Sequence, residues 1–378
     1  MEKAAIEQHY FRSLGLVPTF LLGVALCLTM LGMVMLFSAG AVRGAQDLLA
    51  KQSVWLVLAL VAGAVSAWID LDFLKKRTPL IFGLCIFGLI LTLIPEIGVR
   101  VNGAQRWIGL GPLRVQPSEF VKIGLVLGCA YYFAMKQRTT AQFLDGFAIP
   151  SAWLGLICGL ILLQPDFGTS FLCGAVGATL MFQAGTSLKW LMPVGGLAVS
   201  AFSVLVYFDP VRIRRVTSFL DVEANANDSA YQLWQGMLAF GVGGIDGVGL
   251  GLGRQQMHFL PEAHTDFIFP VIGEELGMIA TMSVLIAFLL LFGLTCWKLR
   301  CVSRLYDYLI AMGALLFITL QAIINLGVVT GSLPTKGMSL PFISYGGSNL
   351  VVVFIMVGLI VNVLRRIDQP SPIQAREL

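Results

Sequence analysis

The sequence predicts an all-α protein that crosses a membrane many times. Apolar residues make up 57% of the 378-residue chain and its mean hydropathy is +0.84, well outside the range of soluble domains. Only 12% of the residues are charged, and the apolar residues gather in long runs separated by short polar connections. This composition excludes a soluble globular domain, and the small net charge of +4 gives no indication of a nucleic-acid partner.

Ten apolar runs, found with a window of about 19 residues, are candidate membrane-spanning helices. Several are shorter than the roughly 20 residues that a helix perpendicular to the membrane needs, so their ends are fixed only to within a few residues. The eighth run is longer than one span requires, and we expect it to tilt or to continue past the bilayer. The runs lie at Leu16–Phe37, Ser53–Ile69, Pro79–Ile94, Phe120–Met135, Phe147–Leu163, Thr169–Gln183, Leu188–Phe208, Phe267–Trp297, Tyr308–Gly331 and Leu350–Leu364.

The chain is predicted to form one membrane domain, 1–378, since it shows no fixed-period repeat and no low-complexity linker. The first run is too long for the core of a signal peptide and similar runs follow it, so we interpret it as a retained span. The seven cysteines have no metal-ligand spacing and fall almost entirely in apolar runs. They predict small buried thiols, with no disulfide framework and no zinc.

The short connections predict the orientation of the chain. If both termini lie on one side, that side collects fourteen of the 25 Lys and Arg residues, which makes it the cytoplasmic side by the positive-inside rule. The other eleven lie on or near the outer face, and so many cations there indicate an anionic partner. The fourteen are Lys3, Arg12, Lys75, Lys76, Arg77, Lys136, Arg138, Lys189, Lys298, Arg300, Arg304, Arg365, Arg366 and Arg376.

Three outer connections are unusual in length and composition. They are 94–118, the large extracytoplasmic loop 209–265 between the seventh and eighth spans, and a segment that begins at Ser332. A loop as long as the second, without structure of its own, is usually functional. Its Gly-rich part, 241–253, follows no strand, so a dinucleotide-binding fingerprint is not expected. The glycines favour close approach of the backbone to a lipid, another helix or an anionic headgroup.

Arginines cluster in these connections. Arg212, Arg214 and Arg215 follow Pro210 at the outer end of the seventh run, where anchoring at the membrane interface is an equally good interpretation for any single arginine. The whole set favours a pyrophosphate at headgroup level, because guanidinium groups bind phosphate through paired hydrogen bonds. The remaining outer cations in the set are Arg100, Arg106, Arg114, Arg254 and Lys336.

Three shorter patterns each leave two interpretations. Glu119 and Lys122 have the i, i+3 spacing of a helical ion pair, and a structural pair is favoured over contact with substrate. Asp166, in Q-P-D-F-G-T, is as well placed to cap the sixth helix as to act in catalysis. The S-Y-G-G-S motif that begins at Ser344 lacks the G-x-S-x-G pattern, so a covalent serine mechanism is not expected.

The densest group of ionisable residues lies where the loop 209–265 meets the eighth run. Glu262, His264, Asp266, Glu274 and Glu275 fall within fourteen residues of one another. Ionisable groups at the edge of a hydrocarbon layer are costly, which indicates a functional site.

Asp266 is the best candidate for chemistry within this group. Phe267 and Phe269 would partly desolvate its carboxylate and raise its pKa toward the range of a general base, and Glu262 and His264 are close enough in sequence to share the site. The alternative is that Thr265 or Asp266 caps the eighth helix.

Five motifs together resemble the SEDS family (shape, elongation, division and sporulation), and the resemblance covers essentially all ten runs. A further motif, L-P-T-K-G at 333–337 with Ser348 and Asn349, is more similar to the division branch than to the elongation branch. The five are N-G-A-Q-R-W-I-G (102–109), Q-P-S-E (116–119), Q-P-D-F-G-T (164–169), L-P-E-A-H-T-D-F-I-F (260–269) and P-F-I-S-Y-G-G-S (341–348).

The resemblance implies a peptidoglycan glycosyltransferase that polymerises lipid II into β-1,4 glycan at the outer face of the cytoplasmic membrane. It implies that Asp266 is the general base, deprotonating the acceptor 4-hydroxyl, and that undecaprenyl pyrophosphate leaves with help from the arginines and Lys336, with or without a divalent cation such as Mg²⁺ or Mn²⁺. The implied partner is a class B penicillin-binding protein. Pro270 departs from the expected small apolar residue and is predicted to perturb the eighth helix. The residues predicted to contact substrate are Arg106, Glu119, Lys122, Arg212, Arg214, Arg215, Glu262, His264, Lys336 and Ser344.

Two other functions stay open from the sequence. A lipid II flippase should carry polar groups through the middle of the membrane, whereas the charged residues here cluster toward the outer side. A non-catalytic scaffold for division partners would tolerate replacement of Asp266 and of the outer arginines.

Overall fold

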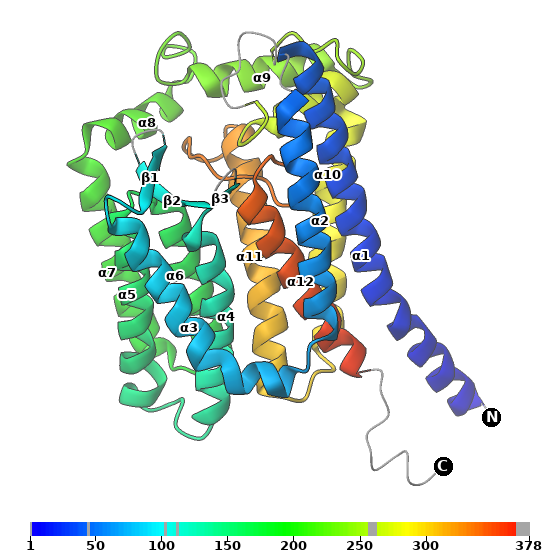
Figure 1. The fold of residues 1–378 in the computed structure, drawn as a ribbon, viewed down its shortest axis with the longest axis vertical. Helices are drawn as coiled ribbons and strands as arrows, with labels where there is room; N and C mark the ends of the chain where they lie inside the picture. The colour runs from blue at the N-terminus through cyan, green and yellow to red at the C-terminus, as the bar shows by residue number, and fades with distance from the viewer. Residues whose placement is uncertain (1, 44–45, 102–103, 111–112, 256–262, 368–378) are drawn as a thin grey trace.

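Long helices stand side by side, and helices joined by short turns run in opposite directions (Figure 1). The computed structural model describes residues 2–43, 46–101, 104–110, 113–255 and 263–367. The long helical elements are α1 (Glu2–Arg43), α2 (Gln46–Trp68), α3 (Leu71–Leu93), α4 (Pro117–Met135), the π-helix η1 (Phe143–Ala148) with α5 (Ile149–Leu163), α6 (Phe167–Gln183), α7 (Leu188–Tyr207), α10 (Ile268–Leu299), α11 (Leu305–Val329) and α12 (Gly347–Ile367).

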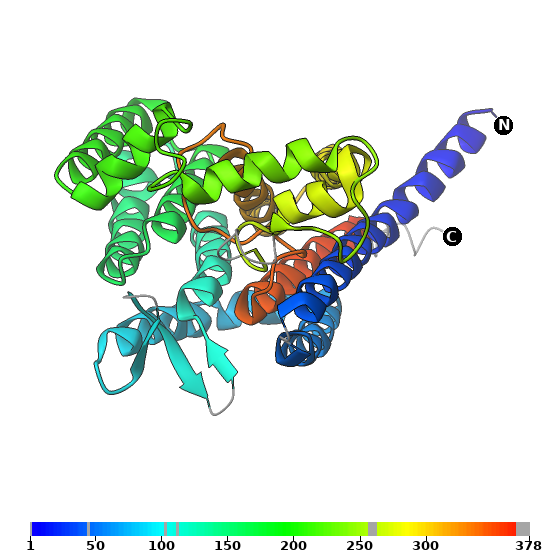
Figure 2. The same cartoon turned by 90° about the horizontal axis from the view of Figure 1, so that it is seen from above.

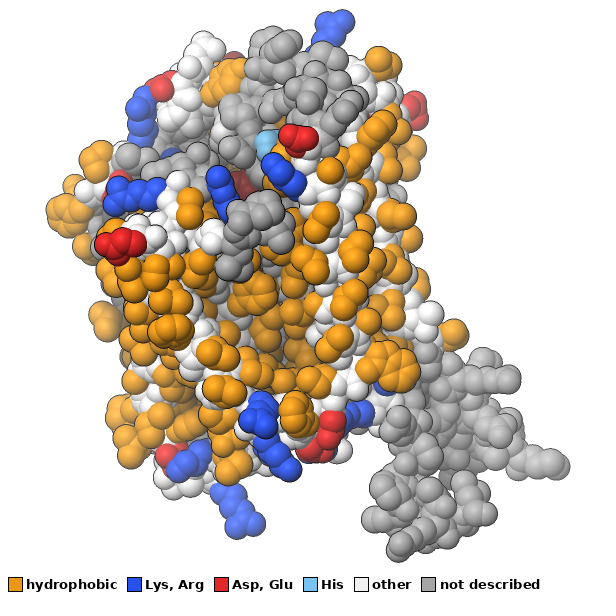
Figure 3. All heavy atoms as spheres, viewed as in Figure 1, with side chains coloured by type: hydrophobic (Ala, Val, Ile, Leu, Met, Phe, Trp, Pro, Cys, Tyr) orange, Lys and Arg blue, Asp and Glu red, His pale blue; other side chains and the backbone are white. Residues whose placement is uncertain are grey.

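Each of the ten predicted runs overlaps one of these long elements. Within the described residues, eight helices are long and apolar enough to cross a membrane, and α6 is a shorter apolar helix. A hydrophobic band separates charged side chains at the two ends of the molecule (Figure 3). The chain therefore has the build of a multi-pass membrane protein, while the count of ten spans stays a prediction.

The expectation of an all-α fold is wrong at one end of the bundle. The first outer connection forms an antiparallel sheet of β1 (Gly98–Val101), β2 (Ala104–Leu110) and β3 (Leu113–Val115), in that order, with Val99 opposite Trp107. The alternating apolar residues and the Asn-Gly dipeptide at 102–103 in the sequence are a hairpin signal that predicts it. We call this the sheet end and the opposite end, where α1 begins and α12 ends, the terminus end.

The connection 209–265 also has secondary structure, contrary to the expectation of an unstructured loop. It contains α8 (Pro210–Leu220) and α9 (Tyr231–Gly243). α8 packs on α7, whereas α9 crosses the sheet end above α10 (Figure 2). The two helices thus cover different parts of the bundle.

α12 is the central helix: 78% of its most apolar stretch is buried inside the protein. It packs on α2, α4 and α11. At the terminus end, Asn362 donates to the carbonyl oxygens of Ser66 and Ile69 at 2.9 and 2.7 Å, satisfying carbonyls at the end of α2. An ion pair of 2.7 Å between Arg366 and Asp70 joins α12 to the turn between α2 and α3.

α10 is broken at Gly277, whose backbone (φ 74°, ψ −171°) is not helical. The Gly-rich segment lies against the break: Val248 and Gly249 donate their amides to the carbonyls of Glu274 and Glu275 at 2.9 and 3.0 Å. On the other side of the break the Met278 amide donates to Gly244. Backbone groups freed by the break are thus paired inside the protein, as a membrane interior requires, and the glycines serve approach to another helix.

The prediction that Pro270 perturbs this helix is wrong. Pro270 is the third residue of α10, and in the first turn of a helix the missing N–H has no partner to lose. The irregularity falls seven residues later, at a glycine.

Substitution of Gly277 by alanine is expected to destabilise the protein by about 1–3 kcal/mol, since a side chain is strained at this backbone conformation. A β-carbon there would also collide with the backbone of residues 245–247. Thermal unfolding in detergent measures the effect. Gly293→Ala in the same helix is the matched control, because its β-carbon would meet nothing within 4 Å; equal midpoints for the two variants would contradict the strained break.

Candidate functional site

The backbone just before α10 is fixed by three donors from distant parts of the chain. The Tyr345 amide donates to the carbonyl of His264 at 2.9 Å, and the Ser344 hydroxyl donates to that of Thr265 at 2.6 Å. Asn325, on α11 and 1% exposed, donates to the carbonyl of Asp266 at 2.8 Å. Three consecutive carbonyls are held, so the position of Asp266 is set by the fold rather than by its own loop.

Asp266 is half-buried and its carboxylate lies against the backbone of the connection between α11 and α12. A β-carbon on Gly337 would lie 2.5 Å from Oδ2 of Asp266, so a side chain at position 337 would displace the carboxylate. The N-cap position of α10 is Phe267, and neither Thr265 nor Asp266 occupies it. The capping interpretation is therefore wrong.

Lys336, next to Gly337, extends to the start of α6. A β-carbon on Gly168 would lie 2.6 Å from Cε and 3.2 Å from Nζ of Lys336. The glycine in Q-P-D-F-G-T thus makes room for the lysine. A primary ammonium group lies between the acid-bearing segment at 266 and the turn that carries Asp166.

Asp166 caps α6, as one of its two interpretations predicted. Its carboxylate accepts from the amide and the hydroxyl of Thr169 at 3.2 and 2.9 Å. Arg106, on β2, lies 3.9 Å from this carboxylate and donates Nε to the carbonyl of Gln164 at 3.0 Å. The sheet thus carries Arg106 to the same turn as Lys336, and the structure brings together two of the predicted outer cations.

Glu119 and Lys122 form a buried ion pair, 7% and 2% exposed. The Lys122 ammonium donates to both carboxylate oxygens at 2.8 Å and to Gln321 at 2.9 Å, and Asn349 donates to Glu119 at 2.8 Å. The pair joins α4, α11 and α12. This supports the structural interpretation, while contact with substrate stays a prediction.

Lys122→Met is expected to destabilise the protein by about 3–5 kcal/mol, because it leaves a buried carboxylate without its cation. Adding Glu119→Gln removes the orphaned charge, so the double variant should recover more than half of the loss. Thermal unfolding of the purified variants tests this, and a double variant less stable than Lys122→Met would contradict it.

Several predicted site residues are not joined to this cluster. Arg214 forms an ion pair with Asp228 and Arg215 is exposed, both on α8, which packs on α7. The side chain of Arg212 and the whole of Glu262 lie outside the described residues. The predicted role of these residues in binding substrate stays a prediction.

His264 and Ser344 lie beside Asp266, but their visible contacts are structural. The buried Ser344 hydroxyl accepts from the Leu340 amide at 2.7 Å besides donating to Thr265. The ring of His264 lies 5.9 Å from that of Tyr345. Partial burial raises the pKa of Tyr345, and the positive charge of Arg114 opposes this to a smaller extent.

Asn325, Gly337 and Gly168 were not predicted from the sequence to be site residues, although they position Asp266 and Lys336. Asn325 could have been found as a polar residue within an apolar run, which is a site signal in membranes. The two glycines lie in the motifs 164–169 and 333–337, but nothing in these motifs shows which side chain each glycine makes room for.

The described residues do not supply a ready ligand set for a divalent cation. Among them, no three His, Cys, Asp or Glu side chains converge in a way that could hold a metal. The described part of the site therefore has no preformed binding site for a divalent cation.

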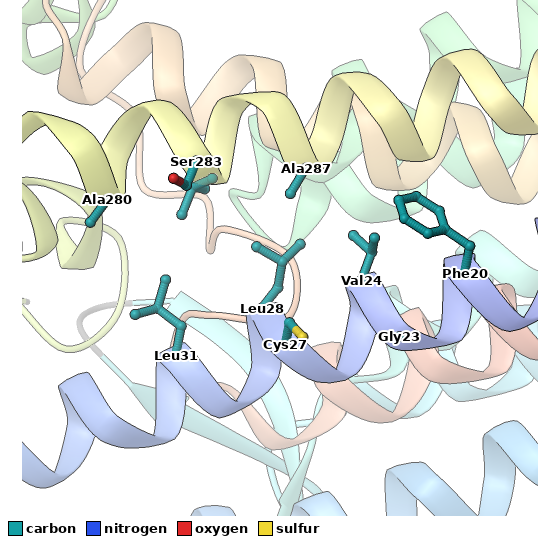
Figure 4. Close-up of a pocket in the computed structure, with 10 residues that line it drawn as sticks. Phe20, Gly23, Val24, Cys27, Leu28, Leu31, Ala280, Ser283 and Ala287 are labelled. Atoms are coloured by element: carbon teal, nitrogen blue, oxygen red, sulfur yellow. The ribbon is translucent and has the colours of Figure 1, made fainter.

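A groove of ≈ 490 Å³ between α1 and α10 lies apart from the polar cluster (Figure 4). Its lining is apolar except for Ser283, whose hydroxyl donates to the Ile279 carbonyl at 2.8 Å. It offers no acid, base or cation for chemistry.

The apolar helix bundle defines a multi-pass membrane protein. At one end of the bundle a polar cluster holds a half-buried acid and nearby cations. The family described as Cell cycle protein (FtsW, RodA and SpoVE) matches residues 18–369. The chain belongs to this family, as its motifs predicted.

Relatives and solved structures agree with the family. Proteins named probable peptidoglycan glycosyltransferase FtsW are similar over nearly their whole length: one from Geobacter sp. (strain M18) is 37% identical over 91% of this chain and 95% of its own. One from Methylococcus capsulatus (strain ATCC 33009 / NCIMB 11132 / Bath) is 39% identical over 90% and 88%.

The fold is similar to that of two solved chains. A chain in a peptidoglycan synthase complex that coordinates polymerization and crosslinking has a TM-score of 0.77 and 29% identity, with 93% of this chain and 98% of that chain covered. The rod shape determining protein RodA of Thermus thermophilus has a TM-score of 0.68 and 27% identity, with 93% and 97% covered.

Proposed function

We propose that this protein is a peptidoglycan glycosyltransferase that polymerises lipid II, in cell division, with Asp266 as the general base. The relatives' name supports the reaction. The observation that carries the site is the fixed backbone of Asp266, with its carboxylate against Gly337 and the Lys336 ammonium on the adjoining residue.

The chemistry follows from an acid held in a fixed, half-buried position. The Asp266 carboxylate accepts the proton of the acceptor 4-hydroxyl as that oxygen bonds to the anomeric carbon of the donor strand. The bond between the anomeric carbon and the pyrophosphate oxygen breaks, and undecaprenyl pyrophosphate departs with the electron pair. A single in-line displacement turns an α-linked donor into a β-1,4 linkage.

The departing pyrophosphate gains negative charge, so cations near Asp266 lower the barrier. Lys336 and Arg106 both reach the turn at the start of α6, and Arg106 is held there by its hydrogen bond to the Gln164 carbonyl. The N-terminus of α6 is itself capped by the Asp166 carboxylate, so this role falls to the two cations rather than to the helix dipole. We assign the leaving group to this turn.

The orientation and partner follow from the same reaction. Lipid II polymerisation belongs at the outer face of the cytoplasmic membrane, so the sheet end faces outward and both termini face the cytoplasm. A class B penicillin-binding protein is the proposed partner, supported by the likeness to a chain of a synthase complex.

The test uses purified full-length protein in vesicles with labelled lipid II. Long glycan polymer and released undecaprenyl pyrophosphate are expected. Gel electrophoresis detects the polymer and thin-layer chromatography detects the released lipid. Movement of lipid II headgroups across the vesicle membrane without polymer would replace the proposal with a flippase, and neither activity would leave a scaffold.

A further inference from the structure

The half of α10 next to Asp266 is also anchored at its far end. Residues 268–276, which we call the half-helix, precede the break at Gly277. The last turn of the half-helix carries Glu274 and Glu275, 0% and 1% exposed. A carboxylate at such a position is retained only when hydrogen bonds compensate its lost hydration, so its partners indicate its role.

Glu274 is bound by backbone amides directly after the Gly-rich segment. The Arg254 amide donates to Oε1 at 2.7 Å, and the Gln255 amide lies 3.1 and 3.2 Å from the two oxygens. Gly253 makes room for this contact, because a β-carbon there would lie 3.0 Å from Oε2 of Glu274 and 3.0 Å from Oε1 of Glu275. From Gln255 the chain continues to Asp266.

Glu275 anchors the same turn to a different helix. Its two carboxylate oxygens accept from the Ser38 hydroxyl, on α1, at 2.9 and 2.7 Å. The carbonyls of Glu274 and Glu275 bind the amides of Val248 and Gly249. Side chains and main chain of two residues therefore hold 248–255 together with α1, and we call this set of contacts the latch.

The half-helix is continuous from the latch to the residues next to Asp266. α9 packs along it at van der Waals distance: Gly243 lies against the carbonyl of Gly273, and the ring of Phe240 lies 5.7 Å from that of Phe269. Asp266 stands two residues before the first residue of the half-helix. The half-helix thus connects the latch directly to the segment that carries Asp266.

We propose that Glu274 is a positioning residue for Asp266. Its carboxylate fixes 253–255 and the far end of the half-helix, and so sets the distance from the Asp266 carboxylate to the acceptor hydroxyl. The inference rests on the proposed function of Asp266 as general base. Glu274 acts through Asp266, since its own carboxylate is buried and occupied by backbone amides.

The experiment compares Glu274→Ala, Glu274→Gln and Gly253→Ala with the matched control Asp246→Ala, an exposed acid in the same segment. For each, lipid II polymerisation gives kcat and KM, and hydrogen exchange gives the protection of 248–255 and 263–266. Glu274→Ala is expected to lower kcat at least about tenfold with KM within about twofold, because small displacements of a catalytic group cost rate rather than binding.

The other variants separate positioning from general stability. Glu274→Gln keeps an oxygen that accepts the two amides, so it should retain at least about a third of the wild-type kcat. Gly253→Ala pushes on both carboxylates and should lower kcat in the same way. Exchange should rise at 248–255 and 263–266 in Glu274→Ala and Gly253→Ala, and stay unchanged in Asp246→Ala.

Unchanged exchange and unchanged kcat in Glu274→Ala would overturn the inference, as would an equal loss of kcat in Glu274→Gln with unchanged exchange. If Glu274→Ala loses protection throughout the protein, Gly253→Ala and Glu274→Gln decide by the same criteria. A wild-type protein that makes no polymer would defeat the proposed function alone, because the exchange measurements test the latch without any reaction.

Discussion

Replacement of Asp266 by asparagine is expected to lower polymerisation of lipid II at least about 100-fold while the protein stays folded. Asparagine has nearly the same shape, and the backbone contact from Asn325 to the carbonyl of residue 266 does not involve the side chain. What is lost is the ability to accept a proton, and a positioned general base contributes about 10²–10⁴-fold.

The measurement is single-turnover formation of the first glycosidic bond by purified protein. Glu223→Gln, an exposed acid between α8 and α9, is the matched control and should react at the wild-type rate. An unchanged thermal midpoint shows that Asp266→Asn is folded. Full polymerisation by Asp266→Asn would remove this residue from the mechanism.

Substitution of Gly337 by alanine is expected to lower kcat about 10- to 100-fold although it neither adds nor removes a charged group. The new β-carbon would lie 2.5 Å from Oδ2 of Asp266, so the carboxylate has to retreat by roughly 1 Å to reach normal contact, and misplacement on this scale costs up to about 100-fold. KM should change less than kcat, because the change displaces the base rather than the binding groups.

Gly346→Ala is the matched control for this substitution. It lies in the same connection between α11 and α12, and its β-carbon would meet Asn349 at an ordinary 3.7 Å. Steady-state kinetics of both variants on labelled lipid II give the comparison. A Gly337→Ala protein as fast as Gly346→Ala would show that the carboxylate does not work from this position.

The membrane class and the positions of the long helices were predictable from the sequence, which also singled out the segment before α10 as the candidate site. Each of them depends on a local property: a run of apolar residues, or ionisable residues next to such a run. The sheet at 98–115 also has a local signal, and it was missed because hydropathy over about 19 residues hides strands of three to seven residues.

The unstructured loop was predicted for a related reason. α8 and α9 are too short to span a membrane, so the search for spans passes over them. A local perturbation of α10 was predicted at Pro270, following the rule that proline disrupts helices. That rule does not apply in the first turn, where Pro270 lies, and the break falls at a glycine that meets the Gly-rich segment.

The sequence by itself determined that this protein is embedded in a membrane and belongs to a family of polytopic cell-cycle proteins, and it pointed to Asp266 as the candidate acid. Only the tertiary structure decided what holds that acid, because Asn325, Ser344 and Gly337 lie 59 to 78 residues away from it along the chain. Contacts over such separations leave no periodic pattern in a single sequence. They exist because α10, α11 and α12 pack together, and that packing brings their connecting backbones to one point at the sheet end.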